Sequence, residues 1–90
     1  MRFLVTIDLS KADIAAFDHY ERQVVPLLAH YGAEMELRVR SLDRKSEVHL
    51  LRFPDDAAHR AFLADPKRQA MRPIMEGSGA TSTVVEVEHL

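Results

Sequence analysis

The chain has 90 residues, of which 47% are hydrophobic and 29% charged, and its net charge is −2. These values predict a globular domain with one small core, and they argue against a disordered chain and against a nucleic-acid-binding protein, which would need a positive surface. Because the chain lacks cysteine and any apolar run of about 18 residues, disulfides, thiolate metal sites and membrane-spanning helices are not expected. We expect a soluble, cytoplasmic protein whose residues 1–90 form a single domain.

The first two predicted elements are a strand over residues 2–9 and a long amphipathic helix over residues 11–31. The strand is apolar on both faces, which is typical of a central position in a sheet. Ser10 or Asp13 can cap the helix, because a short oxygen-bearing side chain accepts from the free amides of the first turn. Pro26 predicts a kink, since proline lacks the N–H that a helix interior needs. Gly32 then ends the helix.

A hairpin is predicted next. Between residues 33 and 42, Met35, Leu37 and Val39 alternate with charged side chains. This pattern is typical of an edge strand with one buried face and one solvent-exposed face. Residues 43–46 form a polar turn. Residues 47–53 return as a strand that is apolar on both faces and is therefore expected to be central.

The remaining third of the chain predicts two helical segments and a last strand. Asp55 is a good cap for a helix that ends at Asp65-Pro66, and residues 67–75 can form a further short helix. Its Lys67, Arg68 and Arg72 are expected on a solvated face, although such a cluster could also hold an anion. Gly77-Ser78-Gly79 is expected to be a flexible connector into a strand that starts near Thr81.

The order of the elements is therefore β-α-β-β-α-β. Right-handed crossovers turn this order into a ferredoxin-like α+β domain, with a four-stranded antiparallel sheet in the order 4-1-3-2 and the helices on one face. Because both central strands are apolar on both sides, the face without helices would expose a large apolar patch. Such a patch marks an association surface, so we expect a homodimer joined through its sheets.

Three stretches of the sequence carry a family resemblance: VxPLLxxYGxEMxLR over residues 24–38, EVHLLRFPDDAAHRAF over residues 47–62, and DPKRQAMRPI over residues 65–74. Together they resemble the dimeric α+β-barrel superfamily, and most closely a family of small proteins of unknown function. The chain departs from that family's pattern at Ala33, where a second glycine is usual, and at Ala61-Phe62-Leu63, where an aromatic pair is common.

The resemblance implies two protomers with their sheets face to face, and in each protomer a pocket between helices and sheet. Superfamily members include cofactor-free monooxygenases, haem-degrading enzymes, lactone isomerases and stress-responsive proteins. No catalytic residue can be carried over from the resemblance. Candidates for site residues must therefore come from this chain itself.

Glu21 is the polar residue that stands out, because it lies inside the apolar stripe of the first helix. Partial burial would raise its pKa and suit it to acid-base catalysis, while the alternative is an ion pair with an arginine such as Arg52 or with a partner chain. Tyr20 and Tyr31 border the same stripe. Their hydroxyls could bind a ligand, or their rings could belong to the core with only the hydroxyl in contact with solvent. His49 is a candidate base, and Arg38 and Arg52 could hold an anion if they share a face with it.

Three of the remaining histidines, His19, His30 and His59, are expected in solvent, and the absence of HxH and HxxxH pairs argues against a metal site. Two functions remain. The first is a metal-free and cofactor-free enzyme, monooxygenase-like or isomerase-like, that acts on a small hydrophobic or aromatic metabolite. The alternative is a non-catalytic dimer that binds a small ligand or serves a stress response. RNA binding is rejected, because the central strands offer no exposed aromatic side chains.

Overall fold

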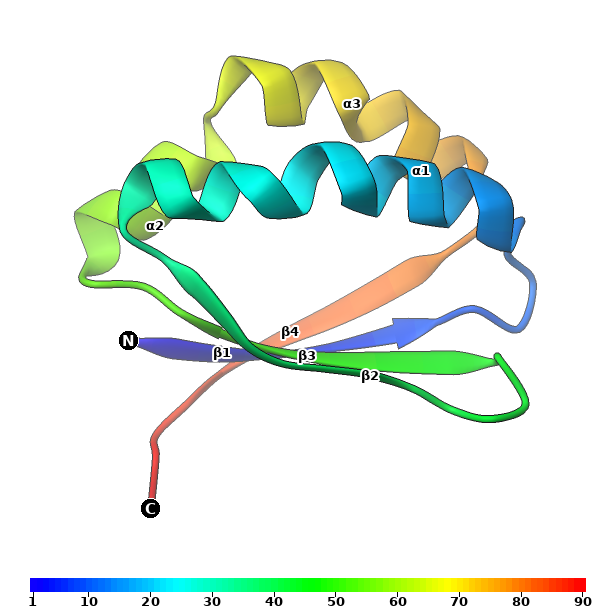
Figure 1. Cartoon of the computed structure of the whole chain (residues 1–90), viewed down its shortest axis with the longest axis horizontal. Coiled ribbons are helices and arrows are strands. Elements are labelled where there is room, and N and C mark those ends of the chain that lie inside the picture. The colour runs from blue at the N-terminus through cyan, green and yellow to red at the C-terminus, as the bar shows by residue number, and fades with distance from the viewer.

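The computed structural model describes all residues from Met1 to Leu90, and it places one layer of helices over one face of a sheet (Figure 1). None of the helices has the length and apolar character that a membrane-spanning segment requires. In chain order, the elements are β1 (Arg2–Asp8), α1 (Ile14–Val24), the 3₁₀ helix η1 (Val25–Tyr31), β2 (Glu34–Arg40), β3 (Ser46–Arg52), α2 (Asp56–Leu63), α3 (Pro66–Gly77) and β4 (Thr81–Val87).

The sheet has the predicted strand order, β2-β3-β1-β4, and every neighbouring pair is antiparallel. The two strands that the sequence marks as apolar on both faces, β1 and β3, are the central ones. Side chains alternate between the two faces of a strand, so Phe3, Val5 and Ile7 of β1 face the helices while Leu4 and Thr6 face away. The ferredoxin-like prediction for the topology is confirmed.

The first helix differs from the prediction at its start and in the geometry of its last turns. It begins at Ile14 because the Asp13 side chain accepts a hydrogen bond from the Ala16 amide at 3.1 Å, so Asp13 and not Ser10 is the cap. The regular α-helix stops at Val24 and continues as the 3₁₀ helix η1, with Pro26 in its first turn. Proline cannot donate to the carbonyl four residues back, so the predicted kink takes the form of a tightened helix. Gly32 ends it at a φ of 67°, as predicted.

The last helix, α3, is longer than predicted. Pro66 occupies its first turn, where a missing N–H costs nothing, and Asp65 caps it by accepting from the Lys67 and Arg68 amides. At the other end the helix includes Gly77, and Ser78 is buried at 3% exposure. The Gly77-Ser78-Gly79 segment is therefore part helix and part packed turn, and the prediction of a flexible connector was wrong.

The edge strand β2 contains a β-bulge between Met35 and Leu37. The bulge changes which face each side chain occupies, because one extra residue shifts the alternation. Met35 packs against the core under the helices, whereas Leu37 and Val39 lie on the opposite face with 45% and 49% exposure. The prediction that Met35, Leu37 and Val39 share one buried face is therefore wrong. The bulge also turns Arg38 and Arg40 toward the helices.

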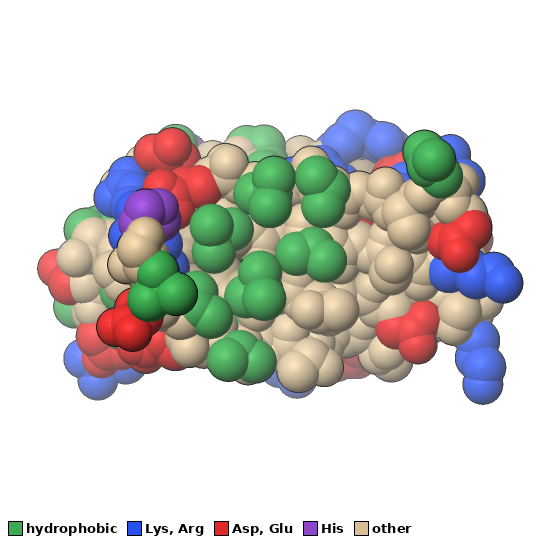
Figure 2. All heavy atoms as spheres, turned by 90° about the horizontal axis from the view of Figure 1, so that it is seen from below, with side chains coloured by type: hydrophobic (Ala, Val, Ile, Leu, Met, Phe, Trp, Pro, Cys, Tyr) green, Lys and Arg blue, Asp and Glu red, His purple; other side chains and the backbone are tan.

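Apolar side chains gather in the middle of the face that carries no helices (Figure 2). They come from all four strands, and Leu37, Val39 and Val85 are among the exposed large hydrophobic residues of the chain. The core proper lies on the other side of the sheet, where Phe17, Phe53 and Ile7 are the largest apolar side chains with almost no exposure. The sheet thus has apolar side chains on both faces, but only one of them is covered within the protomer.

Candidate functional site

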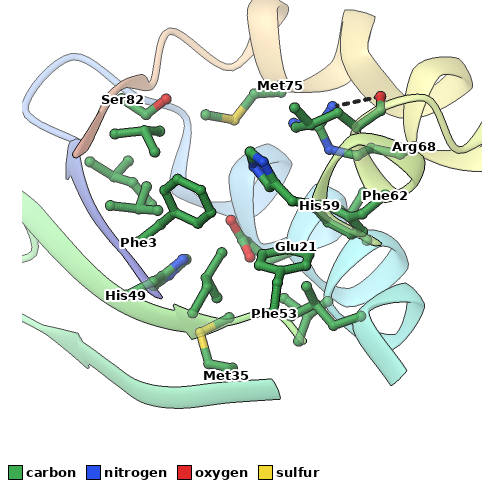
Figure 3. Close-up of a pocket in the computed structure, with 18 of the residues that line it drawn as sticks. Phe3, Glu21, Met35, His49, Phe53, His59, Phe62, Arg68, Met75 and Ser82 are labelled. Carbon is green, nitrogen blue, oxygen red and sulfur yellow. Dashed lines mark hydrogen bonds between the residues drawn. The ribbon is translucent and has the colours of Figure 1, made fainter. Parts of the chain in front are cut away.

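A cavity of about 290 Å³ lies between the helix layer and the sheet (Figure 3). Of its 19 lining residues 14 are hydrophobic, so it favours an apolar ligand. The lining comes from β1, α1, η1, β2, β3, α2, α3 and β4. Val84 of β4 lines the cavity and is nevertheless 56% exposed, so the cavity opens along the β4 edge of the sheet.

Glu21 projects from α1 into this cavity and is 6% exposed. Its carboxyl group makes no hydrogen bond or ion pair within the chain. Burial raises the pKa of Glu21 to about 7, because the charged form loses its hydration, while the positive charge of Arg38 opposes the shift. Glu21 therefore carries a proton about half the time at neutral pH, which is the condition for exchanging protons with a ligand.

His49 lies across from Glu21 on β3 and is 4% exposed. Its Nε2 is 2.5 Å from Oε2 of Glu47, two residues earlier on the same face of the strand. Burial lowers the pKa of His49, against the opposing effect of the Glu47 carboxylate. A neutral imidazole next to a carboxylate that can only accept carries its proton on Nε2, so Nδ1 keeps a free lone pair.

Glu47 is 2% exposed, and its negative charge is stabilised by ion pairs with arginine side chains. Arg40 donates to its Oε1 at 2.7 Å, and Arg38 donates to its Oε2 at 3.3 Å. Burial alone would raise the pKa of Glu47, but the hydrogen bonds from His49 and Arg40 outweigh it and lower that pKa. Arg40 also pairs with Asp18 of α1 at 2.5 Å, so this ion-pair chain ties the helix layer to the sheet.

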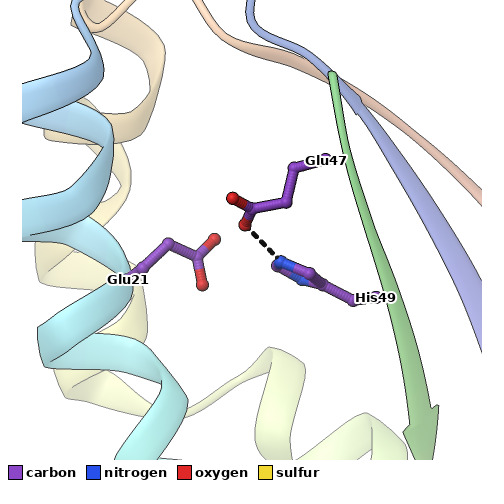
Figure 4. Close-up of side chains that lie close together, drawn as sticks. All are labelled: Glu21, Glu47 and His49. Atoms are coloured by element: carbon purple, nitrogen blue, oxygen red, sulfur yellow. Dashed lines mark hydrogen bonds and ion pairs between the residues drawn. The ribbon is translucent and has the colours of Figure 1, made fainter. Parts of the chain in front are cut away.

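Glu21, Glu47 and His49 offer ligand atoms that all lie within 4.8 Å of one another (Figure 4). Two carboxylates and an imidazole could in principle hold a divalent cation. Both oxygens of Glu47, however, already accept from two guanidinium groups, and a metal there would sit beside two positive charges. The cluster is therefore better suited to sharing a proton than to binding a metal ion.

No family model matches the chain, and no curated protein matches its sequence. Solved structures match over nearly the whole chain. The cofactor-independent oxygenase SnoaB from Streptomyces nogalater, in a variant form, has a TM-score of 0.75 and 17% identity over 99% of this chain and 94% of its own. A dimeric ferredoxin-like protein of unknown function from a Jannaschia species has a TM-score of 0.67 and 18% identity, covering 97% of this chain and 100% of its own.

A protein from Nitrosomonas europaea, provisionally described as an antibiotic biosynthesis monooxygenase, has a TM-score of 0.72 and 13% identity over 99% of this chain and 100% of its own. The chain has the ferredoxin-like α+β fold. At these identities the likeness extends to the fold and not to the chemistry, because unrelated activities share one fold. The function of this ferredoxin-like protein must be argued from its own cavity.

The ferredoxin-like protein brings three of the predicted site residues together at the cavity: Glu21, His49 and Tyr20. Arg38 lies behind them and reaches the cavity residues only through Glu47, because the bulge in β2 sets its direction. The predicted alternative of an ion pair for Glu21 does not occur with Arg52, which pairs with Glu34 at 3.0 Å.

Tyr31 and Arg52 do not line the cavity. The Tyr31 hydroxyl donates to Asp65 at 2.5 Å and so joins η1 to the start of α3. Arg52 alternates with His49 and Leu51 along β3 and therefore lies on the face without helices. Tyr31 thus makes a contact between two elements and Arg52 makes an exposed ion pair, and the structure does not bring either residue to the cavity.

Three further residues near the cavity did not stand out in the sequence. Glu47 orients His49, and the signal that could have found it is the Glu-x-His spacing, which puts two side chains on one face of a strand. His59, expected in solvent, stacks on Phe3 with ring centroids 4.2 Å apart and lines the cavity, and burial lowers its pKa. Arg68, expected on a solvated face, also lines the cavity.

Proposed function

We propose that the protein is a small enzyme that transfers protons on an apolar or aromatic metabolite held in the cavity, without needing a metal or cofactor, and that it works as a homodimer. The observation that carries this proposal is the pairing of a raised pKa at Glu21 with a lowered pKa at His49, side by side in one apolar cavity. Near pH 7 this provides a protonated acid and a neutral base at the same place.

The chemistry that fits is the enolisation of a ketone. Nδ1 of His49 takes a proton from the carbon next to the carbonyl, and the C–H electron pair becomes the C=C bond of the enol. Glu21 gives its proton to the carbonyl oxygen. Glu47 supports this step, because its carboxylate stabilises the imidazolium that forms on His49. Proton return to a different carbon completes an isomerisation.

The same enol could react with dioxygen, in which case a CH₂ group becomes a C=O group and the second oxygen atom leaves as water. Here the substrate itself supplies the electrons. SnoaB, which shares the fold, is a cofactor-independent oxygenase. Because this analogy concerns the fold alone, it supports the oxygenase hypothesis only through the fold and not through any shared residue.

The homodimer is supported by the apolar face of the sheet and by the dimeric ferredoxin-like neighbour. Apolar side chains of the strands gather on the face opposite the helices (Figure 2), and Leu37, Val39 and Val85 among them are exposed. Two such surfaces facing each other would exclude water from both sheets. The cavities lie on the other side of each sheet, so each protomer keeps its own site.

The proposal is tested by hydrogen exchange on an enolisable aryl ketone. The protein is incubated with 2-tetralone in D₂O, and loss of the protons next to the carbonyl is followed by NMR. We expect exchange well above the buffer rate, and a decrease of about a hundredfold or more in Glu21→Gln and in His49→Gln. The control is Glu34→Gln, which removes an exposed carboxylate and should leave the rate unchanged.

The pH dependence of the exchange provides a second criterion. Because Glu21 must carry a proton and its pKa is about 7, the rate should fall as the pH rises above about 7. Oxygen consumption, measured with an electrode, separates an oxygenase from an isomerase. Exchange at the buffer rate would contradict the enzyme hypothesis, and ketone that stabilises the protein but is recovered undeuterated would favour the non-catalytic binding dimer.

A further inference from the structure

Arg68 differs from the other arginines of the chain in having neither an anionic partner nor full exposure. Six of the nine arginines form ion pairs with carboxylates: Arg2, Arg38, Arg40, Arg52, Arg60 and Arg72. Of the three that do not, Arg22 and Arg44 are exposed to solvent, whereas Arg68 is partly buried. A half-buried guanidinium without a counter-charge is a position at which a bound anion would be stabilised.

The contacts of Arg68 leave much of its hydrogen-bonding capacity unused. Nη1 donates to the Leu63 carbonyl at 3.3 Å, and the guanidinium carbon lies 5.2 Å from the centre of the Phe62 ring. Nε is shielded from solvent and has no hydrogen-bond partner. Asp65, the nearest acidic residue in the sequence, is occupied by Tyr31 and by the backbone amides at the start of α3.

Arg68 also has a defined position relative to the cavity. It lines both the inner cavity and an adjoining outer hollow of about 500 Å³, and Tyr20, Leu63, Met75 and Ser82 are shared in the same way. The shared residues therefore lie where the inner cavity and the outer hollow adjoin, and we call this border the mouth of the cavity. Figure 3 shows Arg68 on the helix side of the cavity and His49 on the sheet side, with His59 and Glu21 between them in this view.

We propose that Arg68 binds the carboxylate of an apolar or aromatic organic acid, so that the acid's carboxylate stays at the mouth and its body fills the inner cavity. Substrate identity rests on the proposed enzymatic function, whereas carboxylate binding does not. The planar guanidinium offers a fork that matches a carboxylate, and neither Nη2 nor Nε makes a hydrogen bond within the chain.

The placement also sets which part of the acid can react. A carboxylate held by Arg68 leaves the rest of the molecule inside the cavity, which Glu21 and His49 also line. His59, stacked on Phe3, adds a flat wall against which an aromatic body can pack. Arg68 is the only arginine or lysine that lines the inner cavity, and one guanidinium matches the single charge of a carboxylate.

The test compares two probes of nearly equal shape, 1-naphthoate and its neutral amide, 1-naphthamide. Affinities are measured by titration calorimetry at pH 8 in buffer of low ionic strength. We expect naphthoate to bind at least about tenfold more tightly than naphthamide, since a charged hydrogen bond is added. In Arg68→Gln this preference should disappear with little change for naphthamide, and in Arg68→Lys it should be reduced.

The matched control is Arg60→Gln, which removes an exposed arginine of α2 that pairs with Asp56 and lies outside the cavity lining. It should keep the full preference for naphthoate, and thermal unfolding of each variant shows that it is folded. Equal affinity for the two probes, no binding of either, or a preference that survives in Arg68→Gln would overturn the proposal. Because no turnover is measured, these outcomes are independent of the ketone exchange experiment.

Discussion

Oε2 of Glu47 lies 2.5 Å from Nε2 of His49, and both side chains project from the covered face of β3. Their spacing of two residues is what places them together, because alternate side chains of a strand share a face. Glu47 connects this pair to Arg40, and Arg40 connects it to Asp18 of α1. The same carboxylate thus orients the candidate base and anchors the helix layer on the sheet.

Replacing Glu47 with glutamine should therefore destabilise the protein strongly. Glu47→Gln removes the only carboxylate that pairs with Arg38 and one of the two that pair with Arg40, and losing charged hydrogen bonds at a buried carboxylate costs about 1–3 kcal/mol. Urea denaturation at pH 7 measures the loss in the free energy of unfolding. Glu34→Gln is the matched control, because its ion pair with Arg52 is exposed and should contribute less than about 1 kcal/mol. Equal losses in the two variants would contradict the anchoring role of Glu47.

Glu21 should make the stability of the protein fall as the pH rises. In the unfolded chain its pKa is near the ordinary 4.5, while in the folded protein the pKa is raised to about 7. Between these values the folded state binds more protons than the unfolded state, so the free energy of unfolding decreases with increasing pH and levels off above about 7. The loss amounts to about 3 kcal/mol.

Glu21→Gln removes this titrating group, so the variant should gain about 2–3 kcal/mol relative to the wild type between pH 5 and pH 8. Urea denaturation of both proteins at the two pH values gives the comparison. Glu76→Gln changes an exposed carboxylate of α3 and serves as the control for general charge effects. A wild-type to Glu21→Gln difference that is the same at pH 5 and pH 8 would show that Glu21 is not desolvated in the folded protein.

The positions of Glu21 and His49 illustrate what the sequence can and cannot predict. Helical periodicity places Glu21 inside an apolar stripe, and that alone indicates a buried carboxylate. Partners across the sheet depend on register, and the bulge near Met35 changes which face Arg38 and Arg40 occupy. A single inserted residue in an edge strand leaves no mark in an alternating pattern, so the ion pairs of Glu47 could not be predicted.

His59 and Arg68 were missed for a different reason. Both lie on short helices among charged residues, where local composition indicates solvent. Their burial is set by the tertiary arrangement: α2 packs over Phe3 of β1, and α3 begins where Asp65 and Tyr31 meet. The β-α-β-β-α-β order and the central positions of β1 and β3 needed no such information, because apolar patterning within each strand specified them.

The open face of the sheet should form the dimer interface, and one added charge should disrupt it. Val85 lies on that face in β4 and is 53% exposed in the protomer, so Val85→Asp should fold normally. A buried, unpaired carboxylate at the interface opposes association. We expect the wild type to sediment as a dimer at micromolar concentration and Val85→Asp as a monomer.

Leu42→Asp is the control for this experiment, because Leu42 is fully exposed in the turn between β2 and β3. This variant should remain dimeric. Circular dichroism establishes that both variants keep their secondary structure. A wild type that sediments as a monomer, or a Val85→Asp variant that remains a dimer, would be incompatible with association through the sheet.

Gly77 and Gly79 frame the turn before β4, and alanine at these two positions should have opposite effects. Gly79 has a φ of 84°, and a Cβ there would lie 2.7 Å from the Lys11 carbonyl oxygen. Gly77 is the last residue of α3, and a Cβ there meets no atom within 4 Å. Gly79→Ala should therefore destabilise the protein by about 1–3 kcal/mol, whereas Gly77→Ala should stabilise it by up to about 1 kcal/mol.

Thermal and urea unfolding of the two alanine variants measure this difference under the same conditions. The strain in Gly79→Ala cannot relax easily, because the Ser78 carbonyl accepts from the Asp13 amide at 2.7 Å and fixes the turn against the start of α1. The turn thus connects the cap of α1 to the first residue of β4. If Gly79→Ala were as stable as Gly77→Ala, the turn would be free to move, as its glycine content alone predicts.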